Sequence, residues 1–178
     1  KVDTILLAAA ADEQADTDAD LDGEEDTQIT VANLTLNAAT NTVVVQGAEN
    51  LEITKITNNG DEILTATSMT GNLIVTNITN NMTIFAGKGD DEIASTTNKA
   101  YIVHGGDGND TIDMSNTVAT AAELYGDAGN DTIYGGSAGD SISGGTGNDT
   151  INGNGGTDSI TTGTGSDVVI IDSNEGAD

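Results

Sequence analysis

The sequence contains no cysteine, proline, tryptophan or arginine, and its aromatic residues are one Phe and three Tyr. Without cysteine, neither disulfide cross-links nor a thiolate nucleophile can form. Without proline, a long hydrogen-bonded strand ladder meets no interruption. A thick globular core needs large side chains that this chain lacks, so we expect strands of Ile, Val and Thr around a thin interior.

Positive charge is equally scarce. The 178 residues include 30 Asp and Glu against four lysines and one histidine, for a formal net charge of −26. This balance excludes nucleic acid as a natural partner and argues against adsorption to anionic lipid. A compact chain with this charge repels itself, so either the chain is disordered or cations neutralise it. The regular spacing of the aspartates favours cations.

Long hydrophobic runs are absent as well. The longest, Ile5–Ala11, is too short to cross a bilayer, so we expect no direct membrane insertion. No secretion signal with a cleavage site is visible, and whether the chain is a fragment of a longer protein stays open.

Residues 1–30 are predicted to be an acidic N-terminal segment that caps the fold. Val2–Ala11 predicts a short helix or a capping strand. Asp18–Gly23 matches the opening of an EF-hand loop, but Ile29 stands where the twelfth-position Glu is expected. A calcium site and a merely solvated acidic segment both remain open there.

A nonapeptide repeat dominates the C-terminal half. Each copy has Asp at its sixth position and an aliphatic residue at its eighth, and the copies begin at Ala86, Gly105, Gly126, Gly135, Gly144, Gly153 and Thr162. The first three are 19 and 21 residues apart, close to two repeats. If one coil is two repeats, turns at 86, 105, 126, 144 and 162 stack along one edge, and turns at 135 and 153 along the other. Ordinary polar loops near Thr96–Lys99 and Ser115–Thr120 are expected to precede them on that second edge.

An aliphatic rhythm of 9 to 12 residues extends further back, which predicts one short strand per repeat. Its members are Leu34, Val43, Ile53, Ile63, Leu73, Ile84, Ile93, Ile102, Ile112, Leu124, Ile133, Ile142, Ile151, Ile160 and Val169. The predicted fold is all-β: a parallel β-solenoid over residues 31–178, with plain turns in 31–85 and calcium-binding nonapeptides in 86–172. About seven coils at ~4.8 Å each would give a rod of roughly 35 Å.

The nonapeptide chemistry points to calcium. In GGTGNDTIN at Gly144–Asn152, the glycines allow positive φ and a tight turn that aims carbonyl oxygens inward. Asp149 adds a carboxylate, and Thr150 and Ile151 form the strand, with Ile151 inward. Calcium takes six to eight oxygen ligands, and it accepts carbonyls and carboxylates together. One turn cannot supply that many, so each ion is predicted to lie between two stacked turns.

Over Ala86–Ile170 the chain resembles the RTX (repeats-in-toxin) family of calcium-binding β-rolls. The resemblance implies that the sixth-position aspartates and the backbone carbonyls of the turns bind several Ca²⁺ ions. It also implies type I secretion and folding outside the cell. The implied aspartates are Asp91, Asp110, Asp131, Asp140, Asp149, Asp158 and Asp167. The implied turn residues are Gly87, Gly89, Gly105, Gly106, Asp107, Gly108, Asn109, Gly126, Asp127, Ala128, Gly129, Asn130, Gly135, Gly136, Gly144, Gly145, Thr146, Gly147, Asn148, Gly153, Gly163 and Gly165.

Departures from the repeat weaken some turns. Ala138 replaces the fourth-position glycine, Asn154 the second and Thr162 the first. Sites that use the turns at 135 and 153 are therefore less well supported than those at 105, 126 and 144.

Residues 27–85, rich in Thr and Asn, resemble bacterial surface-layer proteins of the RTX type in composition and architecture. We therefore predict a non-enzymatic extracellular structural module on the bacterial cell surface, which folds with calcium and self-assembles laterally or end to end. A cell-surface polysaccharide is a further candidate partner. An RTX adhesin region, and the C-terminal secretion and folding module of an exported enzyme, are the alternatives.

Catalysis and ice binding are the weaker hypotheses. His104 is the only histidine and is expected to be a polar residue beside a turn. Glycosidase-type carboxylates usually need Arg or Lys nearby, and the lysines here are scattered. An ice-binding row of Thr and Asn would be interrupted by Asp107 and Ala128.

Overall fold

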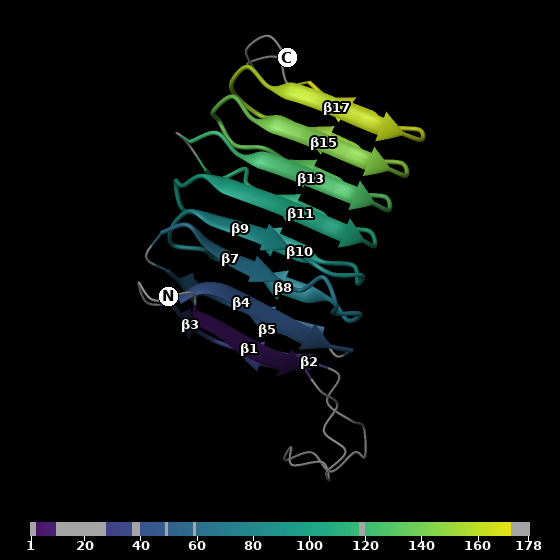
Figure 1. Ribbon diagram of the computed structural model, residues 1–178. Coiled ribbons are helices and arrows are strands. Elements are labelled where there is room, and N and C mark those ends of the chain that lie inside the picture. The colour runs from purple at the N-terminus through teal and green to yellow at the C-terminus, as the bar shows by residue number, and fades with distance from the viewer. Residues whose placement is uncertain are drawn as a thin grey trace, which may run out of the picture.

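The chain winds into a parallel β-solenoid of about seven coils, as the repeat spacing predicts (Figure 1). The computed structural model describes residues 3–9, 28–36, 40–48, 50–58, 60–117 and 120–171. The EF-hand-like segment Asp18–Gly23 and the acidic run around it lie outside the described residues. The described residues contain no helix long and apolar enough to cross a membrane.

Two eight-stranded parallel sheets form the long walls. The first sheet contains β1 (Asp3–Ala9), β4 (Thr40–Gly47), β7 (Glu62–Thr65), β9 (Met82–Phe85), β11 (Tyr101–Asp107), β13 (Glu123–Ala128), β15 (Ser141–Thr146) and β17 (Ser159–Thr164). The second contains β2 (Gln28–Val31), β5 (Asn50–Ile53), β8 (Leu73–Val75), β10 (Glu92–Ala94), β12 (Thr111–Asp113), β14 (Thr132–Tyr134), β16 (Thr150–Asn152) and β18 (Val168–Ile170). A third, two-stranded sheet pairs β3 (Leu34–Thr35) with β6 (Ile56–Thr57). In Figure 1 the strands of the first sheet follow one another up the rod from β1 to β17.

The N-terminal strands continue the same two ladders. β1 pairs in parallel with β4, and β2 pairs with β5. Of the two forms predicted for Val2–Ala11, the structure therefore has the strand, and ladder pairing begins before residue 31.

One aliphatic ladder from each sheet fills the thin interior. In the second sheet Ile93, Ile112, Ile133 and Ile151 lie in register on successive strands and are at most 1% exposed. A matching ladder of the first sheet faces it: Val43, Leu64, Ile84, Val103, Leu124 and Ile142. Aliphatic side chains at one coil spacing bury one another, which explains why a chain with so few aromatics has a continuous core.

Two members of the predicted rhythm were placed in the wrong register. Ile63 is 37% exposed and Ile102 lies on the outer face, whereas their neighbours Leu64 and Val103 are fully buried. Adjacent strand residues face opposite sides, so only one of two consecutive aliphatic residues can enter the core.

Side-chain amides cross-link neighbouring plain coils. Asn58 is 2% exposed, and its Nδ2 donates to Gly60 O (2.9 Å), Glu62 Oε2 (3.0 Å) and Asn81 O (2.8 Å). In the next coil, Thr79 Oγ1 accepts the backbone N–H of Asn58, and the N–H of Asn80 donates to Asn58 Oδ1. This turn satisfies its buried polar groups within the protein.

Candidate calcium centre

The sixth-position aspartates form a vertical ladder along one edge of the rod. The Oδ1 atom of each accepts the backbone N–H of the equivalent aspartate one coil earlier, at 2.8–3.1 Å. The ladder runs through Asp91, Asp110, Asp131, Asp149 and Asp167. This confirms the predicted stacking of the turns that begin at 86, 105, 126, 144 and 162.

The second edge carries a shorter ladder of the same kind. Asp140 donates its N–H to Asp158 Oδ1 (2.8 Å), and Asp140 Oδ1 accepts the N–H of Ala122 (2.8 Å). Below the turn at 135 lies the polar loop that contains Thr117, whose carbonyl accepts the N–H of Ser137 (3.0 Å). The two-edge arrangement expected from the repeat spacing is therefore present.

Beside the first-position glycines of the first edge, Gly105, Gly126 and Gly144, oxygen atoms from two coils meet in one small space. A Cβ placed on Gly126 would collide with Asp131 Oδ2 of its own turn and would lie 2.5 Å from Gly144 O of the next coil. At Gly144 a Cβ would collide with the equivalent pair, Asp149 Oδ2 and the carbonyl oxygen of Thr162. The glycine therefore keeps open a cradle that any larger residue would fill.

The carboxylate oxygens in these cradles are buried and unsatisfied. Asp110, Asp131 and Asp149 are 1–2% exposed, and the Oδ2 atom of each has no hydrogen-bond partner in the described part of the chain. Burying a charged oxygen without a partner costs several kcal/mol, on the order of the desolvation penalty for an ion. A cation in the cradle would remove that penalty.

The pKa values of the ladder aspartates agree with a cation in the cradle. Burial raises the pKa of Asp110 to about 7, and the neighbouring carboxylates Asp91 and Asp131 add to the rise. Burial also raises the pKa of Asp131 to about 6, with Asp149 and Asp127 contributing. Stacked like charges in a low dielectric favour the protonated form or a bound cation.

The donor chemistry selects a hard cation. Within the described residues, no group of three or more His, Cys, Asp and Glu side chains could hold a metal by itself. Backbone carbonyls must therefore complete any site, and Ca²⁺ accepts carbonyls and carboxylates together at flexible coordination numbers. The cradle oxygens of Asp131 and Gly144 are of this kind, so the residues fit calcium.

Comparison with known families decides the identity of these turns. A family model described as the RTX calcium-binding nonapeptide repeat (4 copies) matches residues 102–113, 123–140 and 134–169. The C-terminal coils are an RTX calcium-binding β-roll. These repeats are calcium-binding, and proteins that contain them are typically secreted and serve as structural or binding modules. Neither a curated protein nor a solved structure matches the chain.

Within the RTX roll, the fourth position of every first-edge turn that begins at 105, 126, 144 or 162 is a glycine, whereas Ala138 occupies it in the second-edge turn at 135. Gly129 has φ +139°, and a Cβ there would overlap the carbonyl of Gly108 one coil below. The second position is more tolerant: Asp127 (φ 73°) and Asn154 (φ 62°) adopt the left-handed conformation of the glycines that they replace. Asp and Asn enter this region more readily than other non-glycine residues.

The third-position residues of the roll direct their carbonyls along the ladder. Ala128 O accepts the N–H of Gly108 (2.8 Å), and Thr146 O accepts the N–H of Gly129 (2.8 Å). Asp107 is exposed and contacts Lys88. The ligand roles predicted for these residues remain predictions.

The fifth-position residues form an exposed amide ladder that sequence reasoning missed. Asn109 Oδ1 accepts both the backbone and the side-chain N–H of Asn130 (2.9 and 3.0 Å), and Asn130 Oδ1 accepts the N–H of Asn148 (2.8 Å). The same ladder continues through Asp90 of the first repeat turn to Asn72 of the plain coil below it. Asn109, Asn130 and Asn148 were predicted as turn residues of the metal site, and that role stays a prediction; their side-chain oxygens bond the next coil. The recurrence of Asn or Asp just before the sixth position was the available signal.

His104 lies in a stack of rings on the outer face of the first sheet. Its ring is 4.9 Å from that of Phe85 and 4.4 Å from that of Tyr125, with nearly parallel planes. His104 Nδ1 is 3.0 Å from Asp127 Oδ2. The ring thus packs between two neighbours of the same strand ladder.

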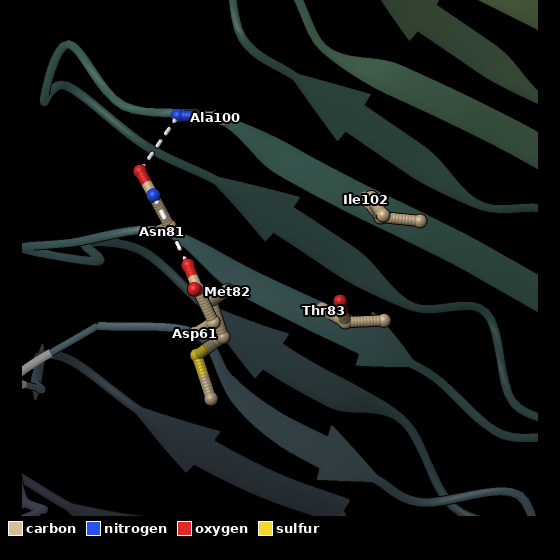
Figure 2. Close-up of a pocket in the computed structure, with 6 residues that line it drawn as sticks. All are labelled: Asp61, Asn81, Met82, Thr83, Ala100 and Ile102. Carbon is tan, nitrogen blue, oxygen red and sulfur yellow. Dashed lines mark hydrogen bonds between the residues drawn. The ribbon is translucent and has the colours of Figure 1, made fainter. Parts of the chain in front are cut away.

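A depression lies beside strands β9 and β11 (Figure 2). Its lining residues are Asp61, Asn81, Met82, Thr83, Ala100 and Ile102. Asn81 accepts the N–H of Ala100 (3.1 Å) and donates to Asp61 Oδ1 (3.1 Å), as Figure 2 shows. These polar groups already bond one another, and the rest of the lining is largely apolar.

Proposed function

We propose that the protein is a calcium-dependent structural module, without catalytic activity of its own, of a type I-secreted protein that assembles on the bacterial cell surface as a surface-layer subunit. The observation that carries the proposal is the row of buried, unpartnered Oδ2 atoms of Asp110, Asp131 and Asp149, which faces carbonyl oxygens of the next coil among the described residues. The calcium-binding part of the proposal rests on the RTX repeats; the surface-layer part goes further.

The residues of the roll supply the switch. The aspartates hold one another through backbone N–H groups, so closing one coil places the carboxylate of the next. Without cations these buried charges oppose the stacked arrangement. A bound calcium ion supplies positive charge that oxygens of two coils share. Because an ion that binds only the folded form stabilises it by mass action, the roll should be loose at cytosolic calcium and folded outside.

The plain coils support a structural role. They share both sheets with the roll in continuous register, so the rod is one stack and not a roll attached by a linker. A strand ladder of this kind can template association with a second copy through its strand edges.

The proposal is tested by far-UV circular dichroism with simultaneous light scattering during a calcium titration, with magnesium as the control. We expect strand signal to rise cooperatively between about 0.1 and 10 mM calcium and not with magnesium. Scattering that rises with it supports a self-assembling surface subunit, whereas a monomer at full strand signal favours an adhesin region or a secretion module. Complete strand signal in chelator, unchanged by calcium, would overturn the switch.

A further inference from the structure

Asp91 differs from the aspartates above it in having both carboxylate oxygens satisfied by the backbone. Its Oδ1 accepts the N–H of Leu73 (2.6 Å), and its Oδ2 accepts the N–H of Gly87 (2.8 Å). The residue is 2% exposed, as buried as Asp110. Its place at the sixth position of the repeat predicts a calcium ligand, but its hydrogen bonds satisfy both carboxylate oxygens.

The turn beneath explains the difference. The turn at 86 rests on a plain coil, where Lys88 N–H bonds Met69 O (3.1 Å). Gly87 has φ outside the left-handed range, whereas the equivalent Gly106 has φ +111°. Gly87 therefore directs its N–H at the carboxylate of Asp91, and the space that would otherwise suit a cation faces a donor.

The interface above this turn contains a cation of the protein's own. Lys88 Nζ lies 3.1 Å from Asp107 Oδ2, which joins the turns at 86 and 105. Both groups are more than half exposed, so the pair contributes little stability. It nevertheless places a positively charged side chain at this interface. The other described repeat turns contain no lysine.

The second edge repeats the pattern at its first repeat turn. Asp140 Oδ2 accepts the N–H of Gly136 (2.7 Å), and Asp140 Oδ1 accepts the N–H of Ala122. Across the interface to the turn at 153, Asn154 Nδ2 donates to Gly135 O (2.7 Å). N–H donors thus engage a carboxylate and a carbonyl oxygen of this interface.

We infer that Asp91 and Asp140 are junction aspartates: they fasten the first repeat turn of each edge to the plain coil beneath through backbone amides and do not bind calcium. In the described part of the chain, the Oδ2 atoms of Asp110, Asp131 and Asp149 receive no such amide, so the turns of these three aspartates hold calcium. This inference rests on the proposed calcium binding and specifies which turns perform it. It also assigns the two junctions a stability that does not depend on calcium.

Native mass spectrometry of the full chain in calcium tests the inference, because it counts bound ions directly. We compare Asp91→Asn and Asp140→Asn with the matched variants Asp110→Asn and Asp131→Asn. The junction variants are expected to retain the wild-type number of ions, and each of the matched variants to lose one. In chelator, Asp91→Asn should lower the unfolding temperature of the plain coils by about 2–12 °C, because an N–H loses its acceptor.

The outcomes separate the inference from the proposed function. Loss of one ion from Asp91→Asn or Asp140→Asn overturns the inference and leaves calcium binding intact. A wild type that binds no ion overturns both. A junction variant that fails to fold is replaced by a measurement on the calcium-loaded wild type: scalar coupling across the hydrogen bonds from Gly87 and Gly136 to the two carboxylates. Observed couplings support the inference, and their absence contradicts it.

Discussion

Filling one cradle with a single methyl group should abolish one calcium site. In Gly126→Ala the new Cβ would collide with Asp131 Oδ2 and lie 2.5 Å from Gly144 O. Neither neighbour can yield easily, since the carbonyl belongs to a strand ladder and the carboxylate is held by the N–H of Asp110. The ideal control is Gly60→Ala, where a Cβ would have no atom within 4 Å.

The expected loss has two parts. Overpacking at a buried site costs about 1–3 kcal/mol. Losing one ion at a free calcium concentration of 100 times its dissociation constant removes about 2.7 kcal/mol more. The variant should therefore lose about 4–6 kcal/mol in calcium, which corresponds to a fall in Tm of about 8–24 °C.

Thermal unfolding monitored by circular dichroism measures this loss, and native mass spectrometry of the same samples counts the ions. Gly126→Ala should bind one ion fewer and show a smaller calcium-induced rise in Tm than the wild type, while Gly60→Ala behaves as the wild type. If Gly126→Ala keeps every ion and its full calcium-induced rise, the space beside Gly126 is not part of a calcium site.

Three further predictions follow from other parts of the rod. In chelator, strand signal should increase as the pH is lowered. Burial raises the folded-state pKa values of Asp91, Asp110 and Asp131 to about 6, 7 and 6. The stability gained by protonating these carboxylates is therefore complete below about pH 4 and is lost as the pH rises to about 7. Replacing His104 by Ala removes two stacked ring pairs and should cost about 1–3 kcal/mol by thermal unfolding, with no change in the number of ions. Replacing Asn58 by Ala leaves buried acceptors without donors and should cost about 1–3 kcal/mol equally in calcium and in chelator, measured by urea unfolding of the plain coils.

Each of these has its own contrary result. A chelator-treated protein that loses strand signal on acidification would show that the buried carboxylates do not favour the protonated form. For His104, the matched change Ser143→Ala lies in the same ladder beyond Tyr125, and an equal loss there would discount ring stacking. A cost at Asn58 that appears only in calcium would mean that the plain coils depend on the metal.

The strands and edges could be predicted because a solenoid repeats one local environment. The spacing of Asp110, Asp131 and Asp149 predicts that they lie in one row, since each coil must return to the same edge, and their hydrogen bonds confirm it. Residues 63 and 102 were misassigned because a period of 9 to 12 residues does not say which of two adjacent aliphatic side chains enters the core. Pairing with the neighbouring coil decides it.

The residue types of the candidate site could be predicted from the repeat, but which individual turns bind calcium could not. The sixth position of the nonapeptide gives Asp91 and Asp110 the same role, although their turns begin with Ala86 and Gly105. The structure adds a second difference: amides of the plain coil beneath and of its own turn bond both oxygens of Asp91, whereas Asp110 Oδ2 has no such donor among the described residues. The Asn109–Asn130–Asn148 ladder was missed for a related reason. Its side chains bond across coils, and a single repeat does not show which neighbour they meet.

The most direct test of the account is residue-resolved hydrogen exchange of the full chain with and without calcium. We expect amides of the plain coils, such as Ile53 and Val75, to be protected in both conditions, and amides of the roll, such as Asp110 and Asp131, to be protected only in calcium. Equal protection of the roll in chelator would contradict the claim that its stacked carboxylates need a cation to fold.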